Sequence, residues 1–224
     1  MRKYTPLDIP KINRIDSPLG RRYQTPEGNL YPSVTTIFSV QENPAIDAWR
    51  ARVGEEEATR IMNRAAQRGT WVHTQCEYYL KGGDKFVDPS SILIENMLYF
   101  PMWKSLRPHV EKIGDVIALE TPLWCDRLQV AGTVDCIGYW NGELSIIDFK
   151  TSSRRKARDE IDNYWAQTAA YSLMLYERTG LKATQLVIMM AVEEDDPLIY
   201  TDRVSAWAPW FNLMRKEYRD KKGE

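Results

Sequence analysis

The stretch that decides the fold is LQVAGTVDCIGYWNGELSIIDFKT, residues 128–151. Residues on both sides of Asn141-Gly142 are rich in β-branched and aromatic types, and Asn-Gly is a strong signal for a two-residue hairpin turn. In that register the residues that flank the turn face each other, and Asp135 lies directly opposite Asp148. We therefore predict a β-hairpin that carries two facing carboxylates.

Two like charges that face each other destabilise a sheet unless something compensates them. Lys150 lies two residues beyond Asp148 and shares its face, but it neutralises only part of the charge. The surrounding strand residues are mostly Ile, Val and Phe, so these carboxylates do not belong to a strand in open water. A divalent cation with oxygen ligands is the compensation that we predict, and an ion-pair cluster on a solvated face is the alternative.

The rest of the chain predicts one domain over residues 1–224, of the α/β or α+β class, with a central mixed β-sheet flanked by helices. Residues 1–113 are expected to be a mainly helical N-terminal part, and residues 114–224 to hold the core sheet and its helices. The expected elements, in order, are an irregular arm or short hairpin (1–32); a helix capped by Ser33 (34–40); a helix capped by Asn43 (44–81), with breaks at Gly54 and Gly69 and an end at Gly82-Gly83; a helical stretch (91–113) interrupted near Pro101 and Pro108; strands (116–125, 128–140, 143–151); a helix (159–178); strands (184–192, 198–204); and a helix (207–222).

Composition limits the classes of function. The 30 basic and 31 acidic residues give a net charge of -1, which excludes coating of nucleic acid through bulk charge but allows a local basic strip. No run of about 18 apolar residues exists, so no membrane partner is expected. The first residues resemble neither a secretory signal nor a transit peptide, and the odd count of three cysteines argues against a disulfide framework. A cytoplasmic location, in a bacterial or phage-infected cell, is the expectation.

Four segments carry a resemblance to a known family. Gly132-Thr133-Val134-Asp135, followed after twelve residues by Asp148-Phe149-Lys150-Thr151, resembles the core motif of the PD-(D/E)XK nuclease superfamily. Arg68–His73 resembles a helical motif of its RecB-like exonuclease branch, and Gln167 with Tyr171 resembles the Q-x-x-x-Y motif. Tyr31–Thr35 resembles the opening segment of the mitochondrial genome maintenance type. The order and spacing agree, and the implied fold is a restriction-endonuclease-like core.

The resemblance implies roles for individual residues. It implies one or two Mg²⁺ or Mn²⁺ ions, held by His73, Asp135, Asp148, the Phe149 backbone carbonyl and, as a further candidate, Glu120. The catalytic residues that it implies are Asp135, Asp148, Lys150, Gln167 and Tyr171. Lys150 would orient the attacking water or stabilise the charged transition state. An exposed strand position is the alternative for Glu120, and a surface pair with Lys81 is the alternative for Glu77.

A second group of residues is expected to bind nucleic acid. These are Ser33, Thr35, Thr151, Ser152, Arg154, Arg155, Lys156, Tyr164, Gln167 and Tyr171. The stretch KTSSRRKAR, residues 150–158, has five bases and no acid, and we favour a phosphate track over a solvated loop. The acidic run Glu193–Asp196 is interpreted as a solvated turn, and His109 as structural.

The predicted function is a divalent-metal-dependent DNA exonuclease that favours single-stranded DNA, with the helices of residues 44–113 forming a passage for a strand end. A recombination, repair or replication protein is the expected partner. The alternatives are a structure-specific endonuclease, a non-catalytic nucleic-acid-binding module, and a subunit whose access to DNA depends on a helicase or recombinase. No iron–sulfur cluster is expected, because relatives with one use four cysteines and this chain has only Cys76, Cys125 and Cys136.

Overall fold

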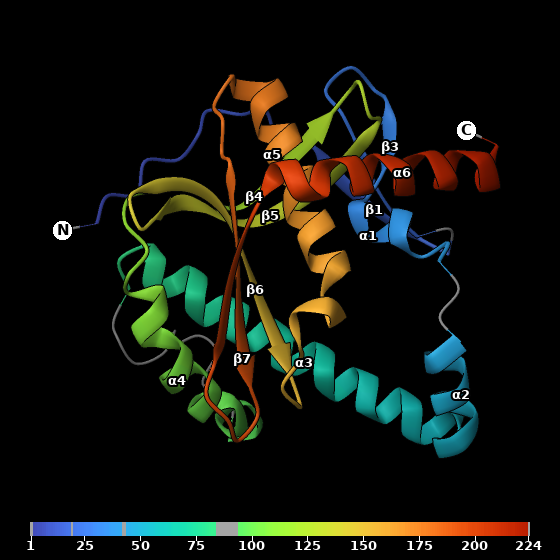
Figure 1. The fold of residues 1–224 in the computed structure, drawn as a ribbon, viewed down its shortest axis with the longest axis vertical. Coiled ribbons are helices and arrows are strands. Elements are labelled where there is room, and N and C mark those ends of the chain that lie inside the picture. The colour runs from blue at the N-terminus through green and yellow to red at the C-terminus, as the bar shows by residue number, and fades with distance from the viewer. Residues whose placement is uncertain (1, 19, 42–43, 84–93, 224) are drawn as a thin grey trace.

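The computed structural model describes residues 2–18, 20–41, 44–83 and 94–223. It contains a three-stranded and a five-stranded β-sheet with helices packed around them (Figure 1). The elements are β1 (Asn13–Ser17), β2 (Gly20–Gln24), β3 (Leu30–Pro32), α1 (Val34–Phe38), α2 (Pro44–Val53), α3 (Glu55–Leu80), the 3₁₀ helix η2 (Ile94–Tyr99), α4 (Phe100–Val110), β4 (Val116–Cys125), β5 (Val130–Trp140), β6 (Glu143–Ser152), the 3₁₀ helix η3 (Arg158–Glu160), α5 (Asp162–Thr179), β7 (Gln185–Val192), β8 (Leu198–Arg203) and α6 (Val204–Lys222).

The large sheet is mixed, as predicted. Its strand order is β4-β5-β6-β7-β8, with β6 and β7 parallel and every other neighbouring pair antiparallel. The parallel pair needs a crossover, which α5 supplies. The apolar run of β7 is buried along almost its whole length, because helices cover both faces of the sheet at this strand.

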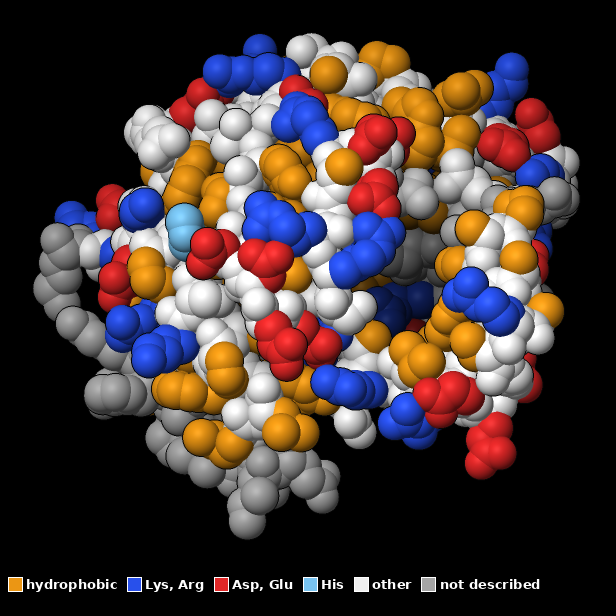
Figure 2. Space-filling view, turned by 60° about the horizontal axis from the view of Figure 1, so that its bottom comes forward, with side chains coloured by type: hydrophobic (Ala, Val, Ile, Leu, Met, Phe, Trp, Pro, Cys, Tyr) orange, Lys and Arg blue, Asp and Glu red, His pale blue; other side chains and the backbone are white. Residues whose placement is uncertain are grey.

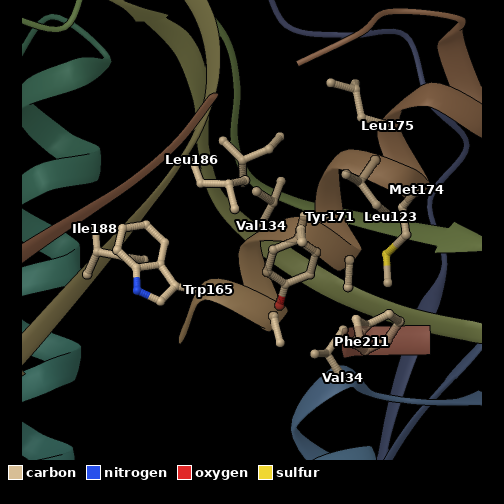
Figure 3. Packing of buried hydrophobic residues seen from close by; sticks show 14 of the residues in the cluster. Val34, Leu123, Val134, Trp165, Tyr171, Met174, Leu175, Leu186, Ile188 and Phe211 are labelled. Carbon is tan, nitrogen blue, oxygen red and sulfur yellow. The ribbon is translucent and has the colours of Figure 1, made fainter. Parts of the chain in front are cut away.

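Helices cover the two faces of the sheet in separate layers (Figure 1). On one face, α5 packs with α1 and α6 around a core that includes Trp165, Met174 and Phe211 (Figure 3). On the other face, α3 and α4 pack around Trp103 and Phe149. A third cluster, with Tyr23 and Tyr31, joins the small sheet to β4 and β5. No helix among the described residues is long and apolar enough to cross a bilayer.

The predicted hairpin register is confirmed. Trp140 faces Glu143, and the pairing continues in step to Cys136 opposite Ile147. Asn141 and Gly142 have φ angles of 52° and 82°, as a type I′ turn requires. The pairing ends one position before Asp135 and Asp148, so the strands begin to separate where the two carboxylates stand.

Several expected boundaries were wrong. Gly69 does not break α3, because one helical glycine costs only about 1 kcal/mol and the helix packs on the sheet on its C-terminal side. Pro101 begins α4 instead of interrupting it, since the first turn of a helix needs no N–H donor there, and α4 also continues past Pro108. The N-terminal arm contains the β1–β2 hairpin, in line with the short hairpin expected there, and β3 extends it to a three-stranded sheet that was not expected. The predicted cap Asn43 and the expected helix start near Ser91 lie outside the described residues.

Candidate metal centre

Three carboxylates lie at the same level of the sheet, on three neighbouring strands. Glu120 on β4 lies between two residues that pair with β5, and this register places Glu120 opposite Asp135. Extending the β5–β6 register by one position beyond Cys136 and Ile147 places Asp135 opposite Asp148. Glu120 also has a φ angle of 44°, a left-handed conformation that is uncommon outside glycine, so the surrounding fold constrains it. The sequence pattern predicted that Asp135 faces Asp148, but it did not predict that Glu120 faces Asp135.

His73 on α3 completes a cluster with two of the carboxylates. Its Nδ1 lies 3.5 Å from Oδ2 of Asp135 and 3.8 Å from Oε1 of Glu120. One potential ligand atom from each of the three residues lies within 4.8 Å of the others. Two carboxylates and one imidazole in this arrangement suit a divalent cation.

The ionisation of His73 reflects the negative charge around it. Burial by itself lowers the pKa of His73, but the Asp135 and Glu120 carboxylates outweigh that effect and raise the pKa to about 9. A protonated imidazole therefore supplies positive charge between the carboxylates when no cation is bound. A cation at this position would take over the same role and displace the proton.

The Asp148 carboxylate is nearly inaccessible, with 1% of the side chain exposed. Its Oδ2 lies 2.6 Å from Nζ of Lys150, whereas its Oδ1 accepts no hydrogen bond from any residue that the structure describes. Burial raises the pKa of Asp148, and the Lys150 ammonium opposes this shift. Burial also acts to lower the pKa of Lys150, but Asp148 and Asp135 outweigh it and raise that pKa. A buried carboxylate oxygen without a donor fits a metal ligand.

A chain of polar contacts runs from Lys150 into α5. Nζ of Lys150 lies 3.4 Å from Oε1 of Gln167, and Nε2 of Gln167 donates to the Tyr171 hydroxyl at 3.2 Å. The Tyr171 ring is buried in the core cluster of Figure 3. Gly132 makes room for the ring, because a Cβ there would lie 2.8 Å from Tyr171 Cε1. These contacts bring together the predicted catalytic residues of β6 and α5.

The basic stretch of residues 150–158 is not a free positive strip. Arg154 pairs with Glu160, Arg155 with Asp195 at 2.8 Å, and Arg158 with Asp202 at 2.5 Å. Lys156 donates to the Tyr164 hydroxyl at 2.9 Å, and Nζ of Lys150 lies 5.0 Å from the centre of the same ring. Tyr164 thus lies between two lysines beside the candidate metal centre, while the arginines are paired with acids.

The acidic run Glu193–Asp196 is a turn whose last three residues are exposed, as interpreted, but Glu193 makes a further contact. Glu193 accepts from the guanidinium of Arg68 at 2.7 Å, and the Arg68 side chain is only 8% exposed. This pair connects α3 to the turn after β7. Arg68, part of the helical motif recognised in the sequence, therefore anchors α3 to the sheet.

The remaining predicted residues differ in their burial and in their contacts. Ser33 is buried, and its hydroxyl caps α1 by accepting from the Thr36 N–H, whereas Thr35 is exposed. Thr151 lies beside Gly69 of α3, and Ser152 is buried at the end of β6. Glu77 pairs with Lys81 at 2.5 Å and also lines the cleft at the centre.

The sequence pattern missed two arginines of this site. A cleft of about 600 Å³ opens at the centre, and its lining includes His73 and Glu120 together with Arg14 and Arg21 of the β1–β2 hairpin. Nothing in their local sequence distinguishes them from other surface arginines. Their place in the cleft depends on how the small sheet docks on β5.

Fold and site together define an α/β protein with a candidate divalent-metal centre at its central hairpin. Residues 93–200 match the family model of the PD-(D/E)XK nuclease superfamily, which confirms the resemblance seen in the sequence. The chain is 23% identical over 210 residues to mitochondrial genome maintenance exonuclease 1 of Homo sapiens, covering 87% of this chain and 60% of that protein. It is 27% identical over 212 residues to the Xenopus tropicalis protein of the same name, covering 86% and 58%.

The chain thus spans about 60% of the length of these curated relatives. Among solved structures, a proposed exonuclease from Eubacterium rectale is similar with a TM-score of 0.43 and 16% identity. That similarity covers 71% of this chain and 68% of the other.

Proposed function

We propose that this chain is a divalent-metal-dependent deoxyribonuclease that hydrolyses phosphodiester bonds from a free end and prefers single-stranded DNA. The observation that carries the proposal is the convergence of His73, Glu120 and Asp135 within 4.8 Å, next to the buried Asp148–Lys150 pair. The match to the PD-(D/E)XK superfamily and the similarity to exonucleases support it.

The proposed metal ligands are Asp135, Asp148, His73, Glu120 and the backbone carbonyl of Phe149. When bound, Mg²⁺ or Mn²⁺ supplies neutralisation of phosphate charge and a bound water of lowered pKa. The orphaned Oδ1 of Asp148 and the close approach of three ligand atoms fit such an ion.

The protein's own groups then position the reactants. Lys150 is held by Asp148 on one side and Gln167 on the other, so its ammonium is fixed beside the site. From there it would donate to the attacking water or to a phosphate oxygen as negative charge develops. The water oxygen bonds to phosphorus and gives up one proton, the bond from phosphorus to one bridging oxygen breaks, and that oxygen leaves as a hydroxyl, so that the net result is transfer of the water's proton to the leaving oxygen. Tyr164 and Thr35 are proposed contacts of the DNA strand.

The distribution of charge on the surface fits binding of one DNA strand at a local site. On the face in Figure 2, acidic and basic side chains are interspersed, and no broad basic surface covers it. The same face has a hollow right of its centre, with Lys or Arg side chains inside it. Local basic groups in a recess favour binding of one strand over coating of a duplex.

The test uses linear single and double strands labelled at either end, with a closed single-stranded circle as the control substrate. Each is incubated with Mg²⁺, Mn²⁺ or EDTA. Metal-dependent shortening of linear strands with intact circles supports the exonuclease and gives its polarity. Cutting of circles would replace it with an endonuclease, and binding without cleavage would leave a non-catalytic module.

A further inference from the structure

The β1–β2 hairpin presents one of its faces to the candidate metal centre. Its register places Arg14 opposite Tyr23 and Asp16 opposite Arg21, so these four side chains share a face. The buried Tyr23 is hydrogen-bonded through its hydroxyl to Thr133 at 3.0 Å. Thr133 lies two residues before Asp135 on β5, and the shared face is therefore directed toward the carboxylates.

The two arginines of that face line the same cleft as the cluster of His73 and Glu120. The β1–β2 hairpin supplies these two arginines, α3 supplies lining residues between positions 69 and 77, and β4 supplies Glu120. The side chains of Arg14 and Arg21 are 49% and 38% exposed, so both can reach a ligand in the cleft.

The backbone at Arg21 is held in place by the start of α1. Its carbonyl accepts two hydrogen bonds, from the Ser33 N–H at 2.9 Å and from the Thr36 hydroxyl at 2.8 Å. Gly20 has a φ angle of 102°, and a Cβ there would lie 2.7 Å from Thr36 Cγ2. Only glycine fits this close approach, so the hairpin is docked rigidly at Arg21.

The charges of the hairpin favour an anion. Asp16 pairs with Arg14 at 2.8 Å and with Arg21 at 3.2 Å, which leaves two cations against one carboxylate. A surface ion-pair group that only stabilises the hairpin is the alternative, and exposed pairs contribute about 0–1 kcal/mol. The position in the cleft favours a ligand role, because arginine forks match phosphate oxygens and the lining also includes His73 and Glu120 of the candidate metal centre.

We propose that Arg14 and Arg21 bind a backbone phosphate of the DNA strand next to the one that is cleaved. Thr36 is a positioning residue, because it acts through the carbonyl of Arg21. This inference rests on the proposed function and adds a second point of substrate binding to it. It assigns the segment Tyr31–Thr36 a supporting role in substrate binding, through the hairpin that it holds.

The test measures binding of a fluorescent single-stranded oligonucleotide in Ca²⁺, for wild type, Arg14→Ala, Arg21→Ala and Thr36→Val. Arg60→Ala is the matched control, since Arg60 is an exposed arginine paired with Glu57 within α3. Each arginine variant of the hairpin should raise Kd about 5- to 20-fold. The slope of log Kd against log salt concentration should also decrease by about 0.7 for each phosphate that the variant no longer binds. Thr36→Val should raise Kd about 2- to 5-fold, whereas Arg60→Ala stays within about 2-fold. With Mg²⁺, KM should rise while kcat at saturating DNA is kept.

Unchanged Mn²⁺ affinity and partial rescue by Arg21→Lys would show that the hairpin variants are folded. If wild type cleaves DNA and both arginine variants match Arg60→Ala in Kd and salt dependence, the proposed phosphate site is overturned while the nuclease stands. If wild type neither binds nor cleaves DNA, the proposed function fails and the phosphate site fails with it.

Discussion

The carboxylate of Asp135 accepts a hydrogen bond from the backbone N–H of Phe149, with Oδ2 at 2.8 Å from the nitrogen. This hydrogen bond occurs where the β5–β6 pairing ends, so a side chain replaces a backbone acceptor across the gap. The consequence is that Asp135 is fixed beside Asp148 and beside the ring of His73. The place where the β5–β6 pairing ends is therefore also the place where the residues of the candidate metal centre come together.

Replacement of Lys150 tests the electrostatic part of the mechanism. Lys150→Ala should lower kcat by about 10²–10³-fold, as removal of one transition-state donor typically does. Single-turnover cleavage of a labelled strand measures the decrease, and Mn²⁺ affinity serves as the control. Retained Mn²⁺ binding together with wild-type kcat would remove Lys150 from the chemistry.

Metal binding should compete with protons at His73. Because the Asp135 and Glu120 carboxylates raise the pKa of His73 to about 9 against the effect of burial, the metal-free protein carries a proton there at pH 7. The apparent Mn²⁺ affinity should therefore rise as the pH increases from 7 toward 9, with release of a proton. Calorimetry in buffers of different ionisation enthalpy measures both quantities. An affinity that is flat over this range would contradict the assigned role of His73.

The same pKa has a consequence for the metal-free fold. A pKa raised above the unfolded value of 6.5 contributes stability that is fully present below pH 6.5 and is lost as the pH rises through about 9. Urea unfolding in EDTA should give a larger decrease in the free energy of unfolding between pH 6.5 and 9 for wild type than for His73→Gln. Equal decreases in the free energy of unfolding of the two proteins would show that a proton on His73 does not stabilise the metal-free fold.

Gly132 and Gly69 should respond in opposite directions to alanine. Gly132→Ala brings a Cβ to 2.8 Å from the Tyr171 ring and should lower the free energy of unfolding by about 1–3 kcal/mol. Gly69→Ala is the control, because among the described residues its Cβ would approach only the Thr151 hydroxyl, at 3.7 Å. Alanine in place of glycine within a helix should raise the free energy of unfolding by up to about 1 kcal/mol. Urea denaturation of both variants compares them. An unchanged free energy of unfolding for Gly132→Ala would mean that the Tyr171 ring moves aside without an energetic cost.

Glu193 should stabilise the chain more than a surface acid does. Glu193→Ala leaves the buried guanidinium of Arg68 without its carboxylate and should cost about 3–5 kcal/mol. Glu57→Ala removes a pair with the exposed Arg60 and should cost less than about 1 kcal/mol. Equal effects in urea denaturation would show that the Arg68–Glu193 pair is no more than a surface ion pair.

The central hairpin was predictable because the information is local. Asn141-Gly142 sets the turn, and the turn sets the register that brings Asp135 opposite Asp148. Apolar runs likewise predicted β6 and β7. These features depend on neighbours a few residues apart, which sequence periodicity captures.

The rest of the site depends on contacts between distant segments. Arg155 pairs with Asp195, 40 residues away in the sequence. The local sequence therefore could not predict that acids neutralise the arginines of the basic stretch. Arg14 and Arg21 reach the cleft only through docking of the small sheet on β5 and α1. The proximity of His73 to Asp135 requires α3 to run unbroken through Gly69, which local helix propensity disfavours.

The role of the hairpin carboxylates as the reactive centre is tested by comparing wild type with Asp148→Asn on an end-labelled linear single strand in Mg²⁺ and in Mn²⁺. Asparagine keeps the shape of the side chain but removes the charge that a cation and Lys150 both need. We expect metal-dependent shortening by wild type and a decrease of at least about 10³-fold in the cleavage rate of the variant, equivalent to about 4 kcal/mol in the barrier. Wild-type cleavage by Asp148→Asn would show that the hairpin carboxylates are not the reactive centre.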